Sequence, residues 1–275
     1  MAVIHVNSWD SFLTAVNTAG ATVILDSDID AGNDIRTSKI EVKCIEVDGQ
    51  NHTIYNFTST HNGDDFNCSF YYEGSYIQPT FKNINFYNIA STGTGRNNAF
   101  FFASYGHFYL RNCRLQGIIN KSLMVRTDLI QSSCTFDRLG FLGGNDTSNH
   151  ILESWIDIGN CVLNDTADNF YYGDVAYSYL KGSLDTNKLR DNYPIFRSDF
   201  ISSIINIELS DSSTNSKTVK LCSDNATNIC LFNNDKVNFS ADTVFTIQNN
   251  FTGLTDSNLK NPAAVIATGF TPFAM

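Results

Sequence analysis

The sequence predicts an all-β fold, a right-handed parallel β-helix closed at its N-terminal end by one amphipathic helix. Three observations predict it. The helical pattern is confined to the first twenty residues, short strand-like runs bounded by Asp, Asn or Gly follow it, and an internal repeat recurs every 22 to 29 residues. We interpret the 275 residues as one domain: a cap over 1–20, β-helix coils over 21–186, and further coils or a less regular C-terminal capping β region over 187–275.

The opening segment has the spacing of a short amphipathic helix. Four apolar residues fall on one helical face: Trp9, Phe12, Leu13 and Val16. Asn7 or Ser8 can cap its N-terminus, and Gly20 follows its end, where glycine is favoured. A solenoid exposes apolar side chains and unpaired strand edges at its ends, so a helix placed here is expected to cover the first coil.

The internal repeat is the strongest indication of stacked coils. Its four copies are 81–88, 110–117, 136–143 and 158–165. The alignment predicts three buried columns: Phe81, Leu110, Phe136 and Ile158; Phe86, Leu115, Phe141 and Leu163; Ile84, Cys113, Leu139 and Cys161. Each buried Phe, Leu or Ile contributes roughly 1.5–3 kcal/mol, so such columns can drive folding.

A polar column is expected beside the apolar ones. Asn83, Asn112 and Asn160 would occupy one turn, where stacked Asn side chains bond to each other, and Arg138 would interrupt that ladder. A looser copy begins at Leu180, beyond which the repeat blurs, although strand-like runs continue over 200–207, 218–222, 228–232 and 243–247. Residues 187–275 are therefore either further coils with long turns or a small capping sheet.

Composition narrows the possible partners. The net charge is −10, no run of Lys or Arg occurs, and only 17% of residues are charged, whereas 32 are Asn. An acidic chain repels a phosphate backbone, so we expect no nucleic-acid partner. The sequence contains no stretch of 18 apolar residues, so we expect no membrane-spanning helix. Residues 1–7 have neither the basic segment nor the apolar core of a secretory signal.

The seven cysteines are expected to be reduced thiols. They form no CxxC pair and have no matching histidine cluster, so the sequence predicts neither a zinc site nor any other metal or cofactor. Cys113 and Cys161 fall in the predicted apolar columns, where a thiol behaves as a small hydrophobic group.

Three stretches resemble the pectate-lyase-like right-handed parallel β-helix superfamily, of the kind found in phage virion proteins and bacterial surface proteins. Residues 9–30 are similar to its capping helix and first strand, 46–54 resemble an early coil, and 253–270 are similar to a closing segment. The resemblance covers most of the chain and implies the fold far more specifically than an activity.

Catalytic residues are not expected. A glycan hydrolase or lyase needs convergent carboxylates, or an Arg base beside calcium. The acidic candidates lie beside Asn, Gly or Thr in apparent turns: Asp64, Asp65, Asp146, Asp165, Asp168 and Asp174. His107 and His150 are 43 residues apart, have no companion nucleophile motif, and are interpreted as ordinary turn residues.

Aromatic side chains are the predicted contacts with a glycan or protein partner. The residues expected to be exposed are Tyr71, Tyr72, Tyr76, Tyr105, Tyr171, Tyr172, Phe270 and Phe273. The apolar tail 263–275 is expected to dock on a neighbouring subunit or protein.

These features, with the resemblance, favour a non-enzymatic structural or host-surface-binding protein of a phage virion, as a head decoration or tail appendage. Its expected location is the virion, after synthesis in the host cytoplasm, and its expected partners are other virion proteins, further copies of itself (a trimer by analogy) and a host surface glycan. Two alternatives stay open: a glycan depolymerase or lyase acting on a host surface polysaccharide, and a bacterial surface adhesin module.

Overall fold

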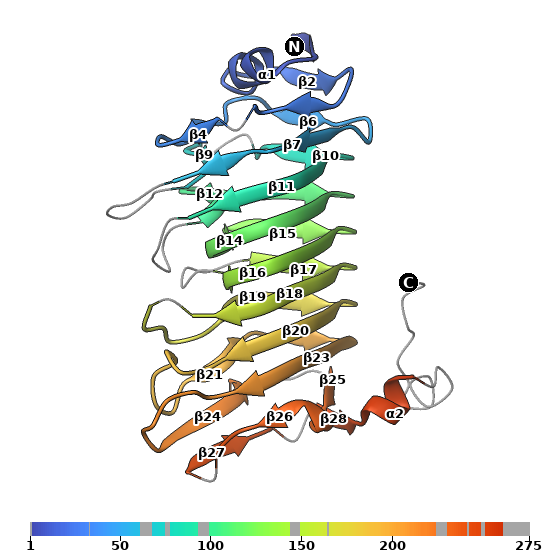
Figure 1. Ribbon diagram of the computed structural model, residues 1–275. Coiled ribbons are helices and arrows are strands. Elements are labelled where there is room, and N and C mark those ends of the chain that lie inside the picture. The colour runs from blue at the N-terminus through green and yellow to red at the C-terminus, as the bar shows by residue number, and fades with distance from the viewer. Residues whose placement is uncertain are drawn as a thin grey trace.

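The computed structural model describes residues 2–32, 34–60, 68–74, 78–92, 99–143, 149–163, 165–223, 230–240, 242–248 and 251–260. Within these residues the chain winds into an elongated stack of coils, and every strand pairing is parallel (Figure 1). Strands of successive coils lie directly over one another, so each side of the stack is a sheet that runs along its length. The predicted parallel β-helix is confirmed.

Two sheets account for the described strands. The first, here called sheet A, contains β1 (Val3–Val6), β2 (Thr22–Leu25), β6 (Glu46–Asp48), β10 (Thr80–Lys82), β13 (Phe108–Arg111), β15 (Thr127–Ile130), β17 (Asn149–Leu152), β19 (Tyr171–Ala176), β21 (Pro194–Arg197), β24 (Lys217–Cys222) and β27 (Thr243–Thr246), with β22 (Phe200–Ile201) paired to β19. The main path of sheet B contains β3 (Ile29–Asp30), β7 (Thr53–Tyr55), β11 (Asn85–Ser91), β14 (Arg114–Val125), β16 (Ser133–Gly143), β18 (Trp155–Val162), β20 (Tyr179–Asp185), β23 (Ser203–Ser210), β25 (Cys230–Asn233) and β28 (Phe251–Leu254).

Shorter strands extend sheet B around the remaining side of the coil. These are β4 (Ile35–Arg36), β5 (Ile40–Glu41), β8 (Thr58–Ser59), β9 (Phe70–Tyr72), β12 (Ala99–Ala103) and β26 (Val237–Asn238). The long strand β14 pairs first with β11 and then with β12, with register shifts between the paired segments. A single strand therefore bends around a corner of the coil, which is how one sheet covers two sides.

The N-terminal helix closes the first coil as predicted. Helix α1 (Trp9–Val16) has Ser8 as its N-cap, and the side chains of Ser8 and Ser11 cap each other's backbone amides. Phe12 and Val16 are buried against the core. Strand β1 precedes the helix in the sequence and pairs with β2. It was not predicted, because its four residues lie within 1–20, the segment assigned to the cap.

Each coil turns sharply between sheet A and sheet B, and one column of residues takes the left-handed backbone conformation there. Its members are Asn83, Asn112, Gln131, Glu153, Tyr177 and Ser202. The amide Nδ2 of Asn112 donates to Oδ1 of Asn83 over 2.8 Å, so the predicted ladder is confirmed for that pair. Asn160 lies instead at a second corner, directly after Gly159, and does not belong to the column.

A buried serine column follows the same corner and was not predicted. The backbone N–H groups of Cys113, Ser132, Ser154 and Ser178 donate to the hydroxyl of the next serine along the stack over 3.0–3.2 Å, ending at Ser203. A corner interrupts the backbone ladder and leaves buried amides that need an acceptor. The serine hydroxyls supply that acceptor in four consecutive steps.

The predicted register is right at its first step and wrong at its second. Phe81 pairs with Leu110, but Leu110 pairs with Leu129, so the third copy starts seven residues earlier than Phe136. The 22-residue offset between the third and fourth copies is confirmed, since Cys134 pairs with Ile156. Residues 136–143 lie in β16 and share with residues 81–86 the spacing of a Phe, an apolar residue three positions later and a second Phe five positions later, so the sequence of one corner resembles that of the other.

The core changes character along the stack. Phenylalanine rings fill its N-terminal half, with neighbouring centroids 5.1–6.5 Å apart, and the cluster contains Phe57, Phe70, Phe81, Phe86, Phe100, Phe101 and Phe108. Further along, Ile, Leu, Val and Cys dominate the buried columns. All seven cysteines are buried and none forms a disulfide bond, as predicted for reduced thiols.

Residues 187–254 continue the same two sheets where they are described. Strands β21, β24 and β27 extend sheet A, and β23, β25 and β28 extend sheet B, so this region forms further coils rather than a separate capping sheet (Figure 1). Helix α2 (Asp256–Leu259) follows the last strand. Neither helix in the described part of the chain is long and apolar enough to cross a membrane.

Candidate functional site

A row of polar and aromatic side chains crosses the solvent-facing side of sheet A. Thr80 pairs in register with Tyr109, Tyr109 with Asp128, Asp128 with His150, and His150 with Asp174. Each lies beside buried residues of its own strand, so the alternation of a β-strand directs all five outward. Five consecutive coils thus display one continuous line of functional groups, which we call the sheet A row.

Asp128 is the centre of the row. Its Oδ1 atom accepts hydrogen bonds from Nδ1 of His107 over 3.0 Å and from Nδ1 of His150 over 2.7 Å. His107 precedes β13 by one residue, and its ring stacks on the ring of His150 with centroids 5.6 Å apart. On the far side, Nε2 of His150 lies 3.8 Å from Oδ2 of Asp174.

Accessibility differs within this cluster. The exposed side-chain fractions are 22% for His107, 13% for Asp128 and 42% for His150. The carboxylate is therefore mostly covered by the two imidazoles, whereas His150 faces solvent. A small ion or a polar group of a ligand can reach the cluster from the outside of the sheet.

The contacts shift two of the pKa values in opposite directions. Burial by itself would raise the pKa of Asp128, but hydrogen bonds from His107 and His150 outweigh it and leave the pKa below its ordinary value. The hydrogen bond to Asp128 raises the pKa of His150 despite partial burial. An ionised carboxylate has no proton to donate, so both imidazoles present a protonated Nδ1 to it.

Chemically, the cluster offers two imidazole nitrogens and one carboxylate oxygen converging on one point, with all three ligand atoms within 4.8 Å of one another. This donor set suits a first-row transition metal rather than calcium or magnesium. A histidine paired with a carboxylate is also the arrangement of a general base. No serine, threonine or cysteine hydroxyl or thiol among the described residues bonds to either imidazole.

Aromatic groups flank the cluster. Tyr109 stacks near His107, with centroids 6.4 Å apart, and the guanidinium of Arg111 lies 5.5 Å from the Tyr109 ring. Tyr105, in the turn that leads into β13, is 63% exposed. Tyrosine rings beside polar groups are suited to stack on sugar rings while the polar groups bond to hydroxyls.

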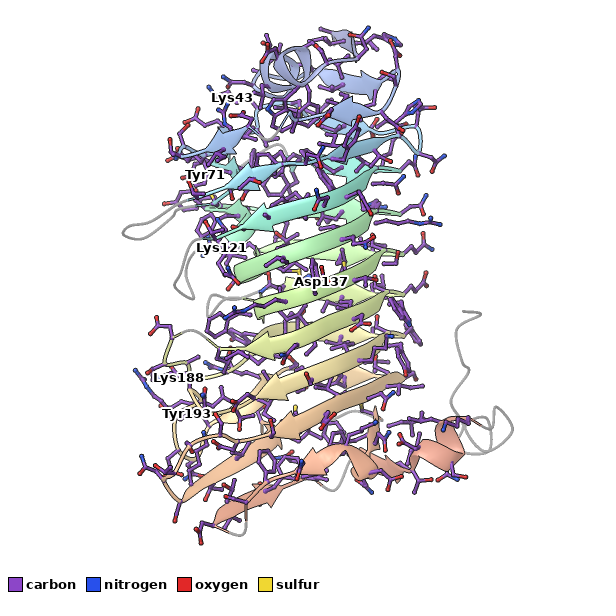
Figure 2. All side chains as sticks on the ribbon, viewed as in Figure 1. Lys43, Tyr71, Lys121, Asp137, Lys188 and Tyr193 are labelled. Atoms are coloured by element: carbon purple, nitrogen blue, oxygen red, sulfur yellow. The ribbon has the colours of Figure 1, made fainter. Side chains whose placement is uncertain are left out.

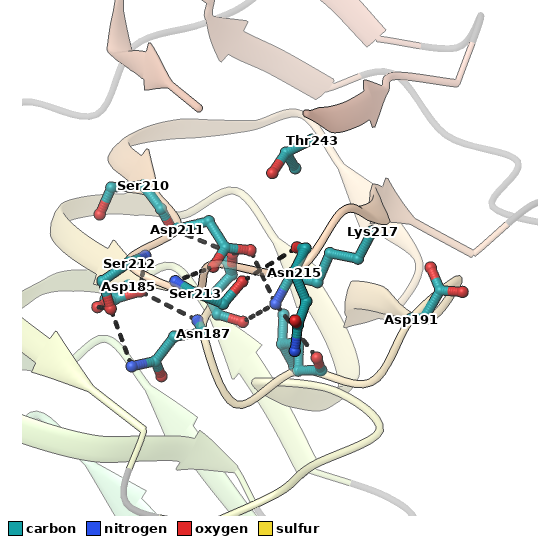
Figure 3. A network of polar contacts seen from close by, with 12 residues as sticks. Asp185, Asn187, Asp191, Ser210, Asp211, Ser212, Ser213, Asn215, Lys217 and Thr243 are labelled. Atoms are coloured by element: carbon teal, nitrogen blue, oxygen red, sulfur yellow. Dashed lines mark hydrogen bonds and ion pairs between the residues drawn. The ribbon is translucent and has the colours of Figure 1, made fainter. Parts of the chain in front are cut away.

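A second polar network joins two stacked turns near the C-terminal end of the stack (Figure 3). The ammonium group of Lys217 lies 2.8 Å from Asp211 and donates to the backbone carbonyls of Thr186 and Leu189 over 2.6 and 3.3 Å. Asp185 accepts from the backbone and hydroxyl of Ser212. Lys217 occupies the position that a bound cation would take, so we interpret this network as structural.

Lys121 lies on the same side of the stack as Tyr71 (Figure 2). It is fully buried, and its amine has no hydrogen-bond partner among the described residues. Burial lowers its pKa to about 8, and burial raises the pKa of the neighbouring Cys68 thiol to about 12.

Several predicted aromatic contacts are corrected by burial. Tyr71 and Tyr72 are buried, the first stacked on Phe102 and the second packed against Phe108, and Tyr171 is fully buried. Tyr71 and Tyr72 belong to β9, in which all three side chains are buried, so the expected alternation fails there. Tyr171 is an inward-facing residue of β19, in which the alternation holds. Tyr105 is exposed as expected, and Tyr172 is partly exposed beneath the guanidinium of Arg197. Tyr76, Phe270, Phe273 and the tail 263–275 lie outside the described residues.

Three of the acidic candidates lie within the described residues and have separate partners, with Asp174 beside His150. Asp165 bonds to the backbone of Thr166, and Asp168 pairs with Arg190 over 2.8 Å. Asp64, Asp65 and Asp146 lie outside the described residues.

The interpretation as an ordinary turn residue is wrong for His150, whereas His107 directly precedes a strand. His150 lies within β17, and the two rings meet across Asp128, a residue that the sequence reasoning did not consider. The internal repeat contains a signal for Asp128, because Asp128 directly precedes buried Leu129 just as Tyr109 directly precedes buried Leu110. Placing the third copy at Phe136 concealed this match.

Comparisons with known proteins add little to this geometry. No protein-family model matches the sequence, and no curated protein matches it. Among solved structures, a chain titled "L. reuteri 53608 SRRP" is similar at 11% sequence identity with a TM-score of 0.40, over 92% of this chain and 98% of that chain. That similarity is too low to assign a family or a function, so the fold rests on the strand pairing described above.

Proposed function

We propose that this protein is a non-enzymatic β-helix that binds a surface polysaccharide through the sheet A row and serves as an attachment or decoration protein of a phage virion. The observation that carries the proposal is the row itself, in which Tyr109, Asp128, His150 and Asp174 follow one another in register. A long flat face with one functional group per coil matches an extended, repeating ligand.

Charge pairing elsewhere on the surface supports this choice of face. Lys181 bonds to Asp157 on sheet B, and Arg190 bonds to Asp168. These charges stabilise neighbouring coils against each other. Tyr105 and Tyr109 are each two residues from His107 in the sequence. The outer face of sheet A therefore combines aromatic stacking surfaces with hydrogen-bonding groups.

Replacing Tyr109 or Tyr105 with Ala is expected to weaken polysaccharide binding by about 2- to 10-fold for each ring, the equivalent of one aromatic contact. Affinity electrophoresis in gels containing host capsule or cell-wall polysaccharide measures the change. Tyr87→Ala is the matched control, because Tyr87 is 53% exposed on sheet B, and it should leave binding unchanged. Equal losses in all three variants would contradict the assignment of this face.

The same polysaccharide, incubated with the protein, distinguishes binding from cleavage. We expect no new reducing ends and no unsaturated uronates. Their appearance, with loss of activity on replacing Asp128 by Asn, would make the protein a depolymerase or lyase and overturn the non-enzymatic assignment.

The virion location and the pectate-lyase-like superfamily rest on the sequence resemblance. Mass spectrometry of gradient-purified phage particles is expected to find the protein at a fixed ratio to the major capsid protein, and immunogold labelling would show whether it lies on head or tail. Recovery only from the host-cell fraction would contradict a virion protein and favour the surface adhesin alternative.

A further inference from the structure

We propose that His107, Asp128 and His150 form a binding site for one first-row transition-metal ion, such as Zn²⁺ or Co²⁺, on the outer face of sheet A. This inference is independent of polysaccharide binding. It rests on three neighbouring coils that direct two imidazole Nδ1 atoms and one carboxylate oxygen to the same point.

The distances are those of a nearly assembled site. Nitrogen and oxygen ligands lie about 2.0–2.2 Å from zinc, which places the ligand atoms of a tetrahedral site about 3.4 Å apart. The Nδ1 to Oδ1 separations here are 3.0 and 2.7 Å, so binding a metal requires each Nδ1 atom to move away from Oδ1 by less than about 1 Å. His150 is the most exposed of the three side chains and has room for this movement.

The backbone holds the ligands in place. Asp128 and His150 are paired residues of adjacent strands β15 and β17, and adjacent strands lie about 4.8 Å apart. His107 enters from the coil before Asp128, one residue ahead of the pair between Phe108 and Thr127. A site built on paired strands is more rigid than one built on loops.

An outer carboxylate completes the arrangement. When Nδ1 of His150 binds a metal, its proton resides on Nε2, and Oδ2 of Asp174 lies 3.8 Å from that atom. A carboxylate beside the second nitrogen of a metal-binding histidine orients the ring and strengthens the ligand. The remaining coordination positions face solvent and would carry water or an oxygen of a bound ligand.

The donor set defines the class of ion. Two imidazoles and one carboxylate favour zinc, cobalt, nickel, copper or iron(II), whereas calcium and magnesium prefer oxygen ligands only. The thiols do not compete, because all seven are buried and burial raises the pKa of each.

The test is titration of the tag-free, reduced full chain with Co²⁺, followed by visible absorption, and with Zn²⁺, followed by calorimetry. We expect one equivalent to bind, with cobalt bands typical of nitrogen and oxygen ligands and without a thiolate charge-transfer band. Asp128→Asn and His150→Gln should abolish this binding, and Asp174→Asn should weaken it about 10- to 100-fold. Far-UV circular dichroism of each variant verifies that its fold is intact.

The chain supplies a matched control. His52 lies 3.2 Å from Asp28, and His5 lies 2.7 Å from Asp26, but no second imidazole among the described residues joins either pair. His52→Gln and His5→Gln should therefore leave the single equivalent unchanged. No binding by the wild-type chain, or equal binding by the folded Asp128→Asn and His150→Gln variants, would overturn the site. Because polysaccharide binding is measured by electrophoresis without added metal, the two proposals can fail separately.

Discussion

Replacing Asp211 with Asn is expected to destabilise the folded protein by about 3–5 kcal/mol at neutral pH, the loss typical of breaking a buried ion pair. The Asp211 side chain is fully buried and that of Lys217 is nearly so. The substitution leaves the Lys217 ammonium group among the backbone carbonyls of Thr186 and Leu189 without a counter-charge. Urea unfolding followed by far-UV circular dichroism measures the loss.

The same pair predicts a dependence on pH. Burial alone would raise the pKa of Asp211, but hydrogen bonds from Lys217 and Ser213 lower it below the ordinary value of 3.8. A carboxyl group whose pKa is lower in the folded state stabilises that state above the unfolded pKa, and this contribution is lost as the pH falls through the folded pKa. Wild-type stability should therefore decrease below about pH 4, and the decrease should be shallower in Asp211→Asn.

Two controls separate the buried pair from ordinary surface charge. Lys217→Met should also destabilise the protein, whereas Asp211→Asn combined with Lys217→Met should recover part of the loss, because no buried charge is left uncompensated. Glu41→Gln removes the exposed partner of Lys43 and should cost less than about 1 kcal/mol. Strictly additive losses in the double variant would show that the two side chains do not interact.

The second large effect is expected from Gly159→Ala, at about 2–5 kcal/mol. Gly159 has a φ angle of +62°, and a Cβ atom there would lie 1.8 Å from the carbonyl oxygen of Phe136 in the preceding coil. Side chains in the left-handed region cost about 1–2 kcal/mol, and overpacking adds about 1–3 kcal/mol. The backbone atoms of two stacked coils leave no space for a methyl group, so the coils must separate locally.

Gly20→Ala measures the backbone part of that effect alone, so the difference between the two variants gives the steric part. Gly20 has a similar φ of +70°, but no atom lies within 4 Å of a Cβ built there. Its substitution should cost only the backbone term, about 1–2 kcal/mol. Equal destabilisation of the two variants in urea unfolding would mean that the coils are not in close contact at Gly159.

Periodicity predicted the elements because each depends on neighbours in the sequence. The spacing of Trp9, Phe12 and Val16 defined the capping helix, and Ser8 was one of its two expected caps. The apolar residues of the repeat, including Phe81, Leu110 and Cys113, are buried as predicted. These features follow from local geometry, in which a helix or strand buries one face whatever it packs against.

Register was harder to predict because it depends on coil length. The coil from Leu110 to Leu129 has a spacing of 19 residues, shorter than the spacings on which the repeat was aligned, so the third copy was placed at the wrong corner. The slip of seven residues moved the third copy to another corner of the coil, where Phe136 and Leu139 are nevertheless buried. Asp128 was overlooked for this reason, and Asn160 was assigned to the wrong column.

The amino-acid sequence by itself determined that this protein is a stack of short parallel strands with an N-terminal helical cap, since alternating burial and turn residues are properties of adjacent positions. Only the tertiary structure decided that His107, Asp128 and His150 meet, because they are 21 and 22 residues apart and come together through the number of residues in each coil. It also decided that Tyr71, Tyr72 and Tyr171 are buried. The outer surface of a β-helix is assembled across coils, so its chemistry depends on register, which no single segment of the chain specifies.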